Sequence, residues 1–93
     1  MSYLMTHFWP GGTEDQYRAT VAAVHPDGGL PAGQTDHFAG PAEGGFLVAV
    51  VWDSKASADA FVSGTLIPAM PVPGGLVGPP EERTAEVVGA LVA

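Results

Sequence analysis

The pattern of apolar and polar residues along the chain predicts a strand followed by a helix in the first quarter. Residues 2–9 are rich in aromatic and β-compatible side chains and end at a Pro-Gly-Gly turn. Thr13 begins a helix, because its hydroxyl and the side chain of Gln16 can form the two halves of a capping box. The helix carries an apolar stripe at Tyr17, Val21 and Val24, and the turn residues 26–29 end it.

The middle of the chain predicts a hairpin. Residues 34–39 form a short second strand, and the Gly and Pro residues of 40–45 form the hairpin loop. Residues 46–52 form a third strand that is apolar at both parities, as expected of a strand covered on both faces.

A second helix and a last strand complete the pattern. Asp53 or Ser54 caps the helix, which keeps helical apolar spacing from Ala58 to Ala69, and Pro68 kinks or ends it. Residues 71–80 are too rich in Pro and Gly for a helix or a central strand, so they form a connector. Residues 83–92 form the last strand, again apolar on both faces.

The order strand, helix, strand, strand, helix, strand predicts one ferredoxin-like α+β domain over residues 1–93. Its four-stranded antiparallel sheet would carry both helices on one face. A bare apolar sheet face would be a large exposed patch, which monomers seldom carry. We therefore expect a homodimer packed sheet to sheet, with the pocket between the two sheets.

Composition sharpens this picture. Three Lys and Arg against ten Asp and Glu give a net charge of −7, which excludes nucleic acid and anionic membrane surfaces as expected partners. Charged residues are only 14% of the chain, in keeping with self-association. There is no cysteine, and we find neither a signal-peptide pattern nor an apolar run of membrane-spanning length, so we expect a protein of the reducing cytoplasm.

Several segments together resemble a known family. The run TDHFAGPAEGGFLVAVVWDSKASADAF at 35–61, TLIPAM at 65–70 and the opening HFWPGGTEDQY resemble the dimeric α/β-barrel superfamily. Within it, the chain is most similar to small actinobacterial proteins related to the antibiotic biosynthesis monooxygenases. The resemblance spans nearly the whole chain and implies the same dimeric fold. The superfamily includes cofactor-free oxygenases, isomerases, haem-degrading enzymes and members without known activity.

The resemblance transfers only some functional residues. Trp52 matches the tryptophan that lines the cavity of the quinone-forming monooxygenases. Their asparagine would fall at Val48 and their helix tyrosine near Ala58, so that part of the oxygenase site is missing. Residues 54–70 contain no histidine to serve as the axial ligand of a haem-degrading enzyme, so a haem role is not expected. The activity that the resemblance implies is cofactor-independent, and no cofactor is expected.

Two strands supply candidate substrate-binding residues. If Trp52 faces the cavity, so do the other even positions of its strand, Phe46, Val48 and Val50, unless these residues are simply dimer core. On the first strand, Tyr3, Met5 and Trp9 share a parity with His7 and would face the cavity, whereas the opposite parity, Leu4, Thr6 and Phe8, would pack against the helices.

His7 and His37 are the candidate catalytic bases, because a neutral imidazole can remove an acidic proton near neutral pH. Either can instead be a hydrogen-bonded structural histidine. His25 closes the first helix, where a cation suits the helix dipole. Glu86 is either an exposed strand residue or a cavity acid. No metal site is expected, because the topology separates His7 from His37 by a whole strand.

These residues support two functions. The first is a cofactor-independent enzyme, oxygenase-like or isomerase/cyclase-like, that acts on a small aromatic or polyketide-type molecule in an apolar cavity. The alternative is a non-catalytic homodimer that binds a small apolar ligand or has a structural role.

Overall fold

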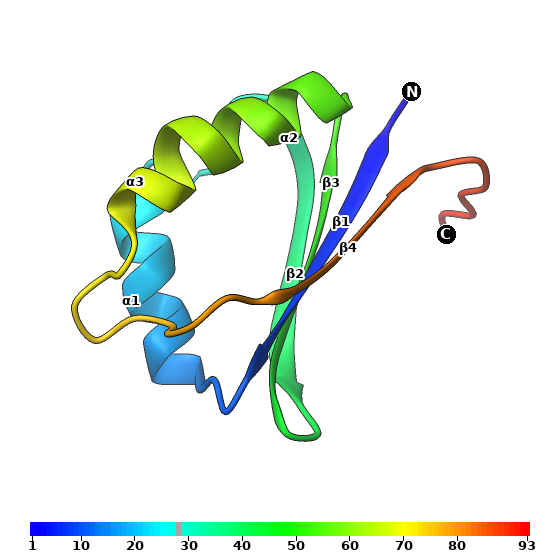
Figure 1. The fold of residues 1–93 in the computed structure, drawn as a ribbon. Coiled ribbons are helices and arrows are strands. Elements are labelled where there is room, and N and C mark those ends of the chain that lie inside the picture. The colour runs from blue at the N-terminus through cyan, green and yellow to red at the C-terminus, as the bar shows by residue number, and fades with distance from the viewer. Residues whose placement is uncertain (28) are drawn as a thin grey trace.

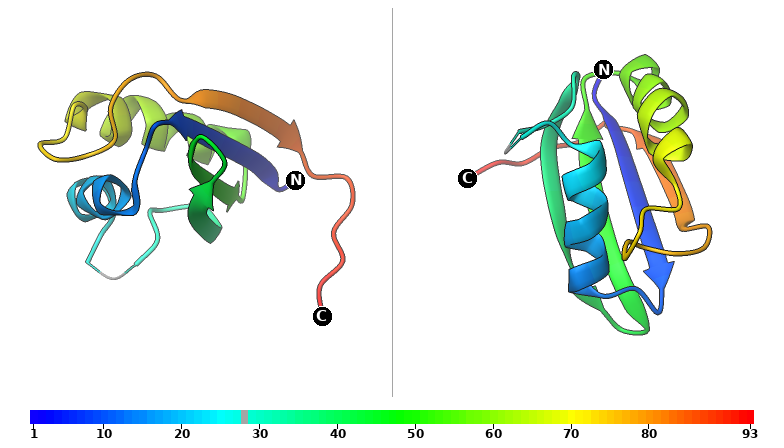
Figure 2. Two further views of the ribbon diagram at one scale, coloured as in Figure 1. Left: turned by 90° about the horizontal axis from the view of Figure 1, so that it is seen from below. Right: turned by 90° about the vertical axis from the view of Figure 1, so that its left-hand side faces the viewer.

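The computed structural model describes residues 1–27 and 29–93 and confirms the ferredoxin-like α+β fold. Four antiparallel strands lie in the order β2-β3-β1-β4, and the helices cover one face of the sheet (Figures 1 and 2). The elements are β1 (Tyr3–Pro10), α1 (Glu14–Val24), β2 (Gln34–Ala42), β3 (Gly45–Trp52), α2 (Lys55–Phe61), the π-helical turn η1 (Val62–Leu66), α3 (Ile67–Ala69) and β4 (Glu81–Glu86). In the described part of the chain, no helix is both long enough and apolar enough to cross a bilayer.

The first helix begins as predicted. The Thr13 side chain accepts a hydrogen bond from the Gln16 amide at 3.2 Å, and the Gln16 side chain accepts one from the Thr13 amide at 3.0 Å. Both halves of the capping box are therefore present. The helix ends at Val24 with His25 as its C-cap; of the predicted terminating turn, residue 28 lies outside the described residues.

The second helix contains a π turn that sequence periodicity did not predict. The Ile67 amide donates to the carbonyl of Val62, five residues back, and the helix ends at Ala69. Pro68 explains this local widening, since it has no N–H to donate and its ring would clash with the carbonyl four residues earlier in a regular α-helix. Pro68 therefore accompanies a widened turn, and the helix ends one residue after it at Ala69, in keeping with the expectation that Pro68 kinks or ends the helix.

The hairpin between β2 and β3 is tighter than predicted. Strand β2 continues to Ala42 and β3 resumes at Gly45, so only Glu43 and Gly44 form the turn. Gly44 has φ +82°, a conformation that favours glycine. Pro41 is tolerated inside β2 because β2 is an edge strand and needs no second partner.

The parity of β1 is the reverse of the one predicted. Tyr3, Met5 and Trp9 are buried against the helices, whereas Leu4, Thr6 and Phe8 lie on the opposite face. The physical reason is the pairing with β3, because Tyr3 lies opposite Trp52 and Trp9 opposite Phe46, and cross-strand partners share one face of the sheet. On β3, Phe46 and Trp52 are 2% and 1% exposed and share this helix-facing side.

The opposite sheet face is uncovered in the single chain. Leu47 on β3 and Phe38 on β2 are 41% and 67% exposed, and no helix of the described chain packs on this side (Figure 2). Within the described chain this sheet face therefore has no covering layer.

The last strand is shorter than predicted. β4 ends at Glu86, and after the Val87 amide bonds to the Ser2 carbonyl at 2.9 Å the chain leaves the sheet (Figures 1 and 2). The predicted strand over 83–92 is present at 83–86, but its continuation to 92 was wrong because β1, its partner, begins at Tyr3 and offers nothing to pair with beyond that point. The apolar residues Val88 and Leu91 are consequently almost fully exposed.

Candidate functional site

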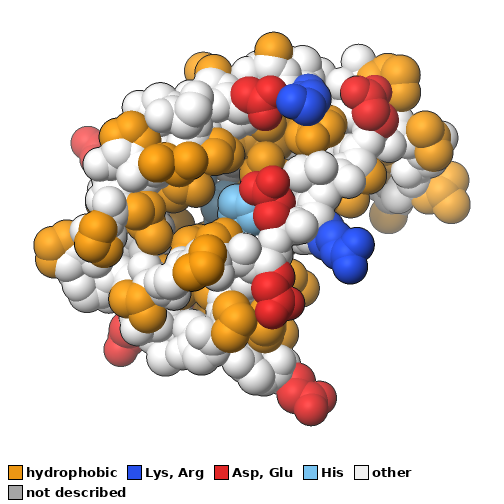
Figure 3. All heavy atoms as spheres, in the orientation of Figure 1, with side chains coloured by type: hydrophobic (Ala, Val, Ile, Leu, Met, Phe, Trp, Pro, Cys, Tyr) orange, Lys and Arg blue, Asp and Glu red, His pale blue; other side chains and the backbone are white. Residues whose placement is uncertain are grey.

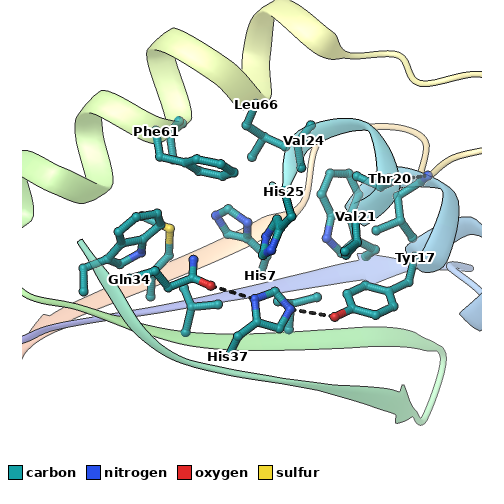
Figure 4. Close-up of a pocket in the computed structure, with 17 residues that line it drawn as sticks. His7, Tyr17, Thr20, Val21, Val24, His25, Gln34, His37, Phe61 and Leu66 are labelled. Atoms are coloured by element: carbon teal, nitrogen blue, oxygen red, sulfur yellow. Dashed lines mark hydrogen bonds between the residues drawn. The ribbon is translucent and has the colours of Figure 1, made fainter. Parts of the chain in front are cut away.

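A pocket of about 70 Å³ lies between the helix-facing side of the sheet and the two helices (Figure 4). It is within one chain, whereas the sequence had suggested a pocket between the sheets of two copies. None of its described lining residues is Asp, Glu, Lys or Arg. The lining comprises Met5, His7, Trp9, Tyr17, Thr20, Val21, Val24, His25, Gln34, His37, Val48, Val50, Trp52, Phe61, Val62, Leu66 and Leu76.

Three polar side chains form a continuous hydrogen-bonded chain along the pocket wall. The Tyr17 hydroxyl lies 2.6 Å from His37 Nε2, and His37 Nδ1 lies 2.9 Å from Gln34 Oε1. An amide oxygen only accepts, so Nδ1 carries the imidazole proton, and Nε2 accepts from the Tyr17 hydroxyl. Figure 4 shows the three side chains in this order. The arrangement is a phenol backed by a neutral imidazole, which is in turn oriented by a buried amide.

Two elements, α1 and β2, bring these groups together. Tyr17 projects from the apolar stripe of α1, and His37 lies on β2. Gln34 is the first residue of β2 and is 7% exposed, next to the register shift between Gln34 and Asp36. Such a bulge re-aims side chains, and here the Gln34 carboxamide reaches the ring three residues later.

Burial favours the neutral forms of Tyr17 and His37, the two titrating side chains of this hydrogen-bonded set. Desolvation raises the pKa of Tyr17, with the nearby Arg18 charge opposing it. Desolvation lowers the pKa of His37, and repulsion from His25 lowers it further. At neutral pH the His37 Nε2 lone pair is therefore free of a proton of its own and available to take one.

His25 differs from the helix-end cation that was expected. Its ring lies edge-on to His37 with centroids 4.8 Å apart, and edge-on to Phe61 at 5.9 Å. Burial lowers its pKa, against a raising effect of a backbone hydrogen bond with Gly29. Desolvation of the ring outweighs the helix-dipole attraction, so His25 is a neutral pocket side chain rather than a surface cation.

His7 enters the same pocket from β1, on the other side of β3 from His37. Its Nε2 lies 2.7 Å from Glu82 Oε2 on β4, and its ring lies edge-on to Trp9 at 6.3 Å. As expected, the strand order places β3 between the two histidine-bearing strands. Among the described residues, no three His, Cys, Asp or Glu side chains converge as a metal site would require.

A larger open cleft of about 680 Å³ adjoins the pocket and shares five lining residues with it, including His7, Trp9 and Leu66. In Figure 3, a histidine side chain lies at the base of a hollow framed by hydrophobic side chains and an acidic one. The connector 71–80 forms one wall of the cleft, and the bond from the Leu76 amide to Thr20 Oγ1, 2.9 Å long, ties it to α1.

Trp52, which lines the pocket, carries a buried polar group without a partner in the described part of the chain. The side chain is 1% exposed, and its indole Nε1 has no hydrogen-bond partner among the described residues. Buried N–H groups are nearly always satisfied, so this donor is suited to a ligand or a water molecule in the pocket.

The predicted site residues are only partly brought together. His7, His37, Met5, Trp9, Val48, Val50 and Trp52 all line the pocket. Tyr3 and Phe46 are buried beside it without lining it, and Glu86 is exposed at the end of β4. Sequence reasoning missed Tyr17 and Gln34. The hydroxyl that Tyr17 brings to an otherwise aliphatic helix stripe was the available signal for the first; no local pattern marked the second.

Comparison with known proteins supports the fold. No family model and no curated protein matches the chain. A crystal structure from Chloroflexus aurantiacus J-10-fl, provisionally assigned as an antibiotic biosynthesis monooxygenase, superposes with a TM-score of 0.66. It is 19% identical, and the match covers 99% of this chain and 98% of the other. The chain therefore has the fold of that protein.

Proposed function

We propose that the chain is a small cofactor-independent enzyme, monooxygenase-like or isomerase/cyclase-like, that deprotonates a small aromatic or polyketide-type molecule. The hydrogen-bonded chain from Tyr17 through His37 to Gln34, at the wall of an apolar pocket, is the observation that carries this proposal. The fold shared with a provisionally assigned monooxygenase is consistent with it. Relatedness to actinobacterial members of that group is part of the proposal and is supported by the sequence resemblance alone.

The proton step uses Tyr17 and His37 of this hydrogen-bonded chain. The substrate gives its acidic proton to the Tyr17 oxygen while Tyr17 passes its own proton to His37 Nε2, which leaves a substrate anion and an imidazolium. Gln34 accepts from Nδ1–H in both states, so the ring does not have to rotate. Trp52 Nε1–H is a donor for the negative charge that develops on a substrate oxygen. Tyr17 thus supplies from α1 the hydroxyl that Ala58 lacks on α2.

The two reaction classes differ in the fate of the substrate anion. An isomerase returns the proton to another substrate atom. An oxygenase lets the anion react with dioxygen; for a methylene substrate, one CH₂ and one O₂ give one C=O and one H₂O, with the substrate supplying the electrons. Both need a site that excludes water, as the apolar wall around Val48 and Val50 does.

The cavity volumes indicate how the substrate lies. A pocket of about 70 Å³ is well below the roughly 300 Å³ of ordinary ligand sites, so it holds only the reacting edge of a ring system. The remainder would occupy the adjoining open cleft, which passes His7 and Leu66. The small inner volume also favours the second candidate, a protein that binds a small apolar ligand without reaction.

Anthrone tests the proposal, because loss of a C10 proton gives an aromatic anthrolate. Exchange of C10–H for deuterium under nitrogen, followed by NMR, reports proton abstraction, and oxygen uptake in air reports oxygenation. We expect exchange above the buffer blank and a loss of at least about tenfold in Tyr17→Phe and His37→Gln. Tyr3→Phe is the matched control, since Tyr3 is buried but does not line the pocket.

The outcomes separate the candidates. Wild-type exchange rates in both variants would remove the Tyr17–His37 assignment. Binding of anthrone without exchange above the blank would assign the pocket to a ligand-binding protein instead. Exchange without oxygen uptake would select the isomerase/cyclase class.

We also propose that the chain is a homodimer in the cytoplasm. The uncovered sheet face with Phe38 and Leu47, and the exposed apolar residues after Glu86, support association; the absence of cysteine fits a reducing compartment. Light scattering should give twice the 9.5 kDa chain mass at micromolar concentration, and Leu47→Asp should reduce it. A monomeric wild type would refute the dimer.

A further inference from the structure

The open cleft beside the pocket has a simple charge pattern. Apart from His7, its lining is apolar except for one carboxylate, Glu82, and no Lys or Arg is among its described lining residues. Two of the three basic side chains of the protein are paired elsewhere, Arg18 with Glu14 and Lys55 with Asp59. A ligand in this cleft therefore meets hydrophobic walls and a single negative group.

Glu82 is held in place rather than free to swing. It lies directly opposite His7 in the β1–β4 register, and Glu82 Oε2 accepts from His7 Nε2 at 2.7 Å. The His7 side chain is 11% exposed and that of Glu82 is 49% exposed. Glu82 Oε1 accepts no hydrogen bond from any described residue, so one carboxylate oxygen is anchored and the other remains available at the cleft.

We propose that this cleft binds a protonated amine attached to an aromatic or aliphatic body. The ammonium donates to Glu82 Oε1, and the body packs against Trp9, Leu66 and Val77. A carboxylate at the same place would face Glu82 without a cation to pair with, in a protein of net charge −7. The cleft thus selects cationic over neutral, and neutral over anionic, molecules of one shape.

This inference extends the proposed function, since it names the class of molecule whose body would reach the Tyr17–His37 chain. It can still be tested separately, because it concerns binding and requires no turnover. The probes are 2-naphthylmethylamine, 2-naphthalenemethanol and 2-naphthoate, which share a ring system and differ in charge. Fluorescence titration at pH 8 and low ionic strength gives a Kd for each.

We expect the amine to bind about three- to fivefold more tightly than the alcohol, as suits a half-exposed ion pair, and the carboxylate to bind least. In Glu82→Gln, whose amide oxygen can still accept from His7, the amine should bind like the alcohol while the Kd of the alcohol stays within about twofold. Glu81→Gln is the matched control; it removes the same charge one residue away, outside the cleft lining. Ile67→Trp, which fills the cleft from α3, should weaken all three probes.

Four results would overturn the inference: no binding of the amine, equal binding of amine and alcohol, a preference that survives Glu82→Gln, or one that Glu81→Gln abolishes equally. The titration is repeated in His37→Gln. If His37→Gln still prefers the amine, and the wild type shows no anthrone exchange, this inference stands and the proposed catalysis is refuted. Anthrone exchange without amine selectivity would do the reverse.

Discussion

The hydrogen bond from the Tyr17 hydroxyl to His37 Nε2 predicts both the pKa of His37 and which of its ring nitrogens carries the proton. Because the Tyr17 hydroxyl donates to the unprotonated Nε2, it stabilises neutral His37. A neutral hydrogen bond is worth about 0.5–1.5 kcal/mol net, and one pKa unit corresponds to about 1.4 kcal/mol. Tyr17→Phe should therefore raise the pKa of His37 by up to about one unit.

Stability should change together with this pKa. The variant loses about 1 kcal/mol at pH 7.5, which lowers the Tm by about 4–8 °C in a domain of this size. Its deficit should shrink on acidification, since a His37 pKa closer to the unfolded value makes folding less sensitive to protons. Tyr3→Phe should leave the pKa of His37 unchanged.

NMR of the imidazole nitrogens provides the assay. Long-range ¹H–¹⁵N spectra distinguish a ring protonated at Nδ1 from one protonated at Nε2, and a pH titration of the ring protons gives the pKa. Neutral His37 should carry its proton on Nδ1, facing Gln34. A ring protonated at Nε2, or a lower pKa in Tyr17→Phe, would refute the direction assigned to the hydrogen-bonded chain.

Three further predictions concern the same pocket. Because burial lowers the pKa values of His25 and His37, the stability that they contribute is present above the unfolded pKa near 6.5 and is lost as the pH falls through their folded pKa values. Urea unfolding should therefore show lower stability at pH 5.5 than at pH 7.5, with a smaller difference in His25→Gln. A wild type that gains stability on acidification contradicts this prediction. Gln34→Leu leaves His37 Nδ1–H without its acceptor and should cost about 1–3 kcal/mol in the same assay, whereas wild-type stability would show that the ring finds another partner. Leu76→Ala, at a 2% exposed anchor of the connector, should cost about 2–5 kcal/mol, and Val77→Ala, 63% exposed, less than about 0.5; equal costs would mean that the connector is not anchored there.

Local signals in the sequence were sufficient for most of the fold. The capping box of Thr13 and Gln16 placed the start of α1, and the spacing of apolar segments gave the order of strands and helices. Two of the errors concern partners that no local pattern records. The facing direction of β1 depends on its pairing with β3, and the end of β4 depends on where β1 begins.

The same limit applies to the site. His37 was predicted as a base because imidazole chemistry is visible in one residue, and Trp52 because of a resemblance. Tyr17 and Gln34 are linked to His37 by hydrogen bonds that span 20 and 3 residues of sequence. Their roles depend on the packing of α1 over β2 and on a bulge, so they could be identified only once those elements were placed in space.

The two histidines have different surroundings, and this difference fits the roles proposed for the pocket and for the cleft. Tyr17 and His37 lie in a pocket whose described lining contains no Asp, Glu, Lys or Arg, whereas His7, which lines both this pocket and the open cleft, is joined to Glu82 at the cleft. A negative charge inside the pocket would oppose formation of a substrate anion, but at the cleft it can attract a cationic group without that penalty, because exposed charges are screened by solvent. The proposed deprotonation and the proposed recognition of charge are therefore assigned to different side chains, Tyr17 and His37 in the pocket and Glu82 at the cleft. Val48→Glu, which adds a carboxylate to the pocket wall, should reduce anthrone exchange even where the amine still binds at the cleft.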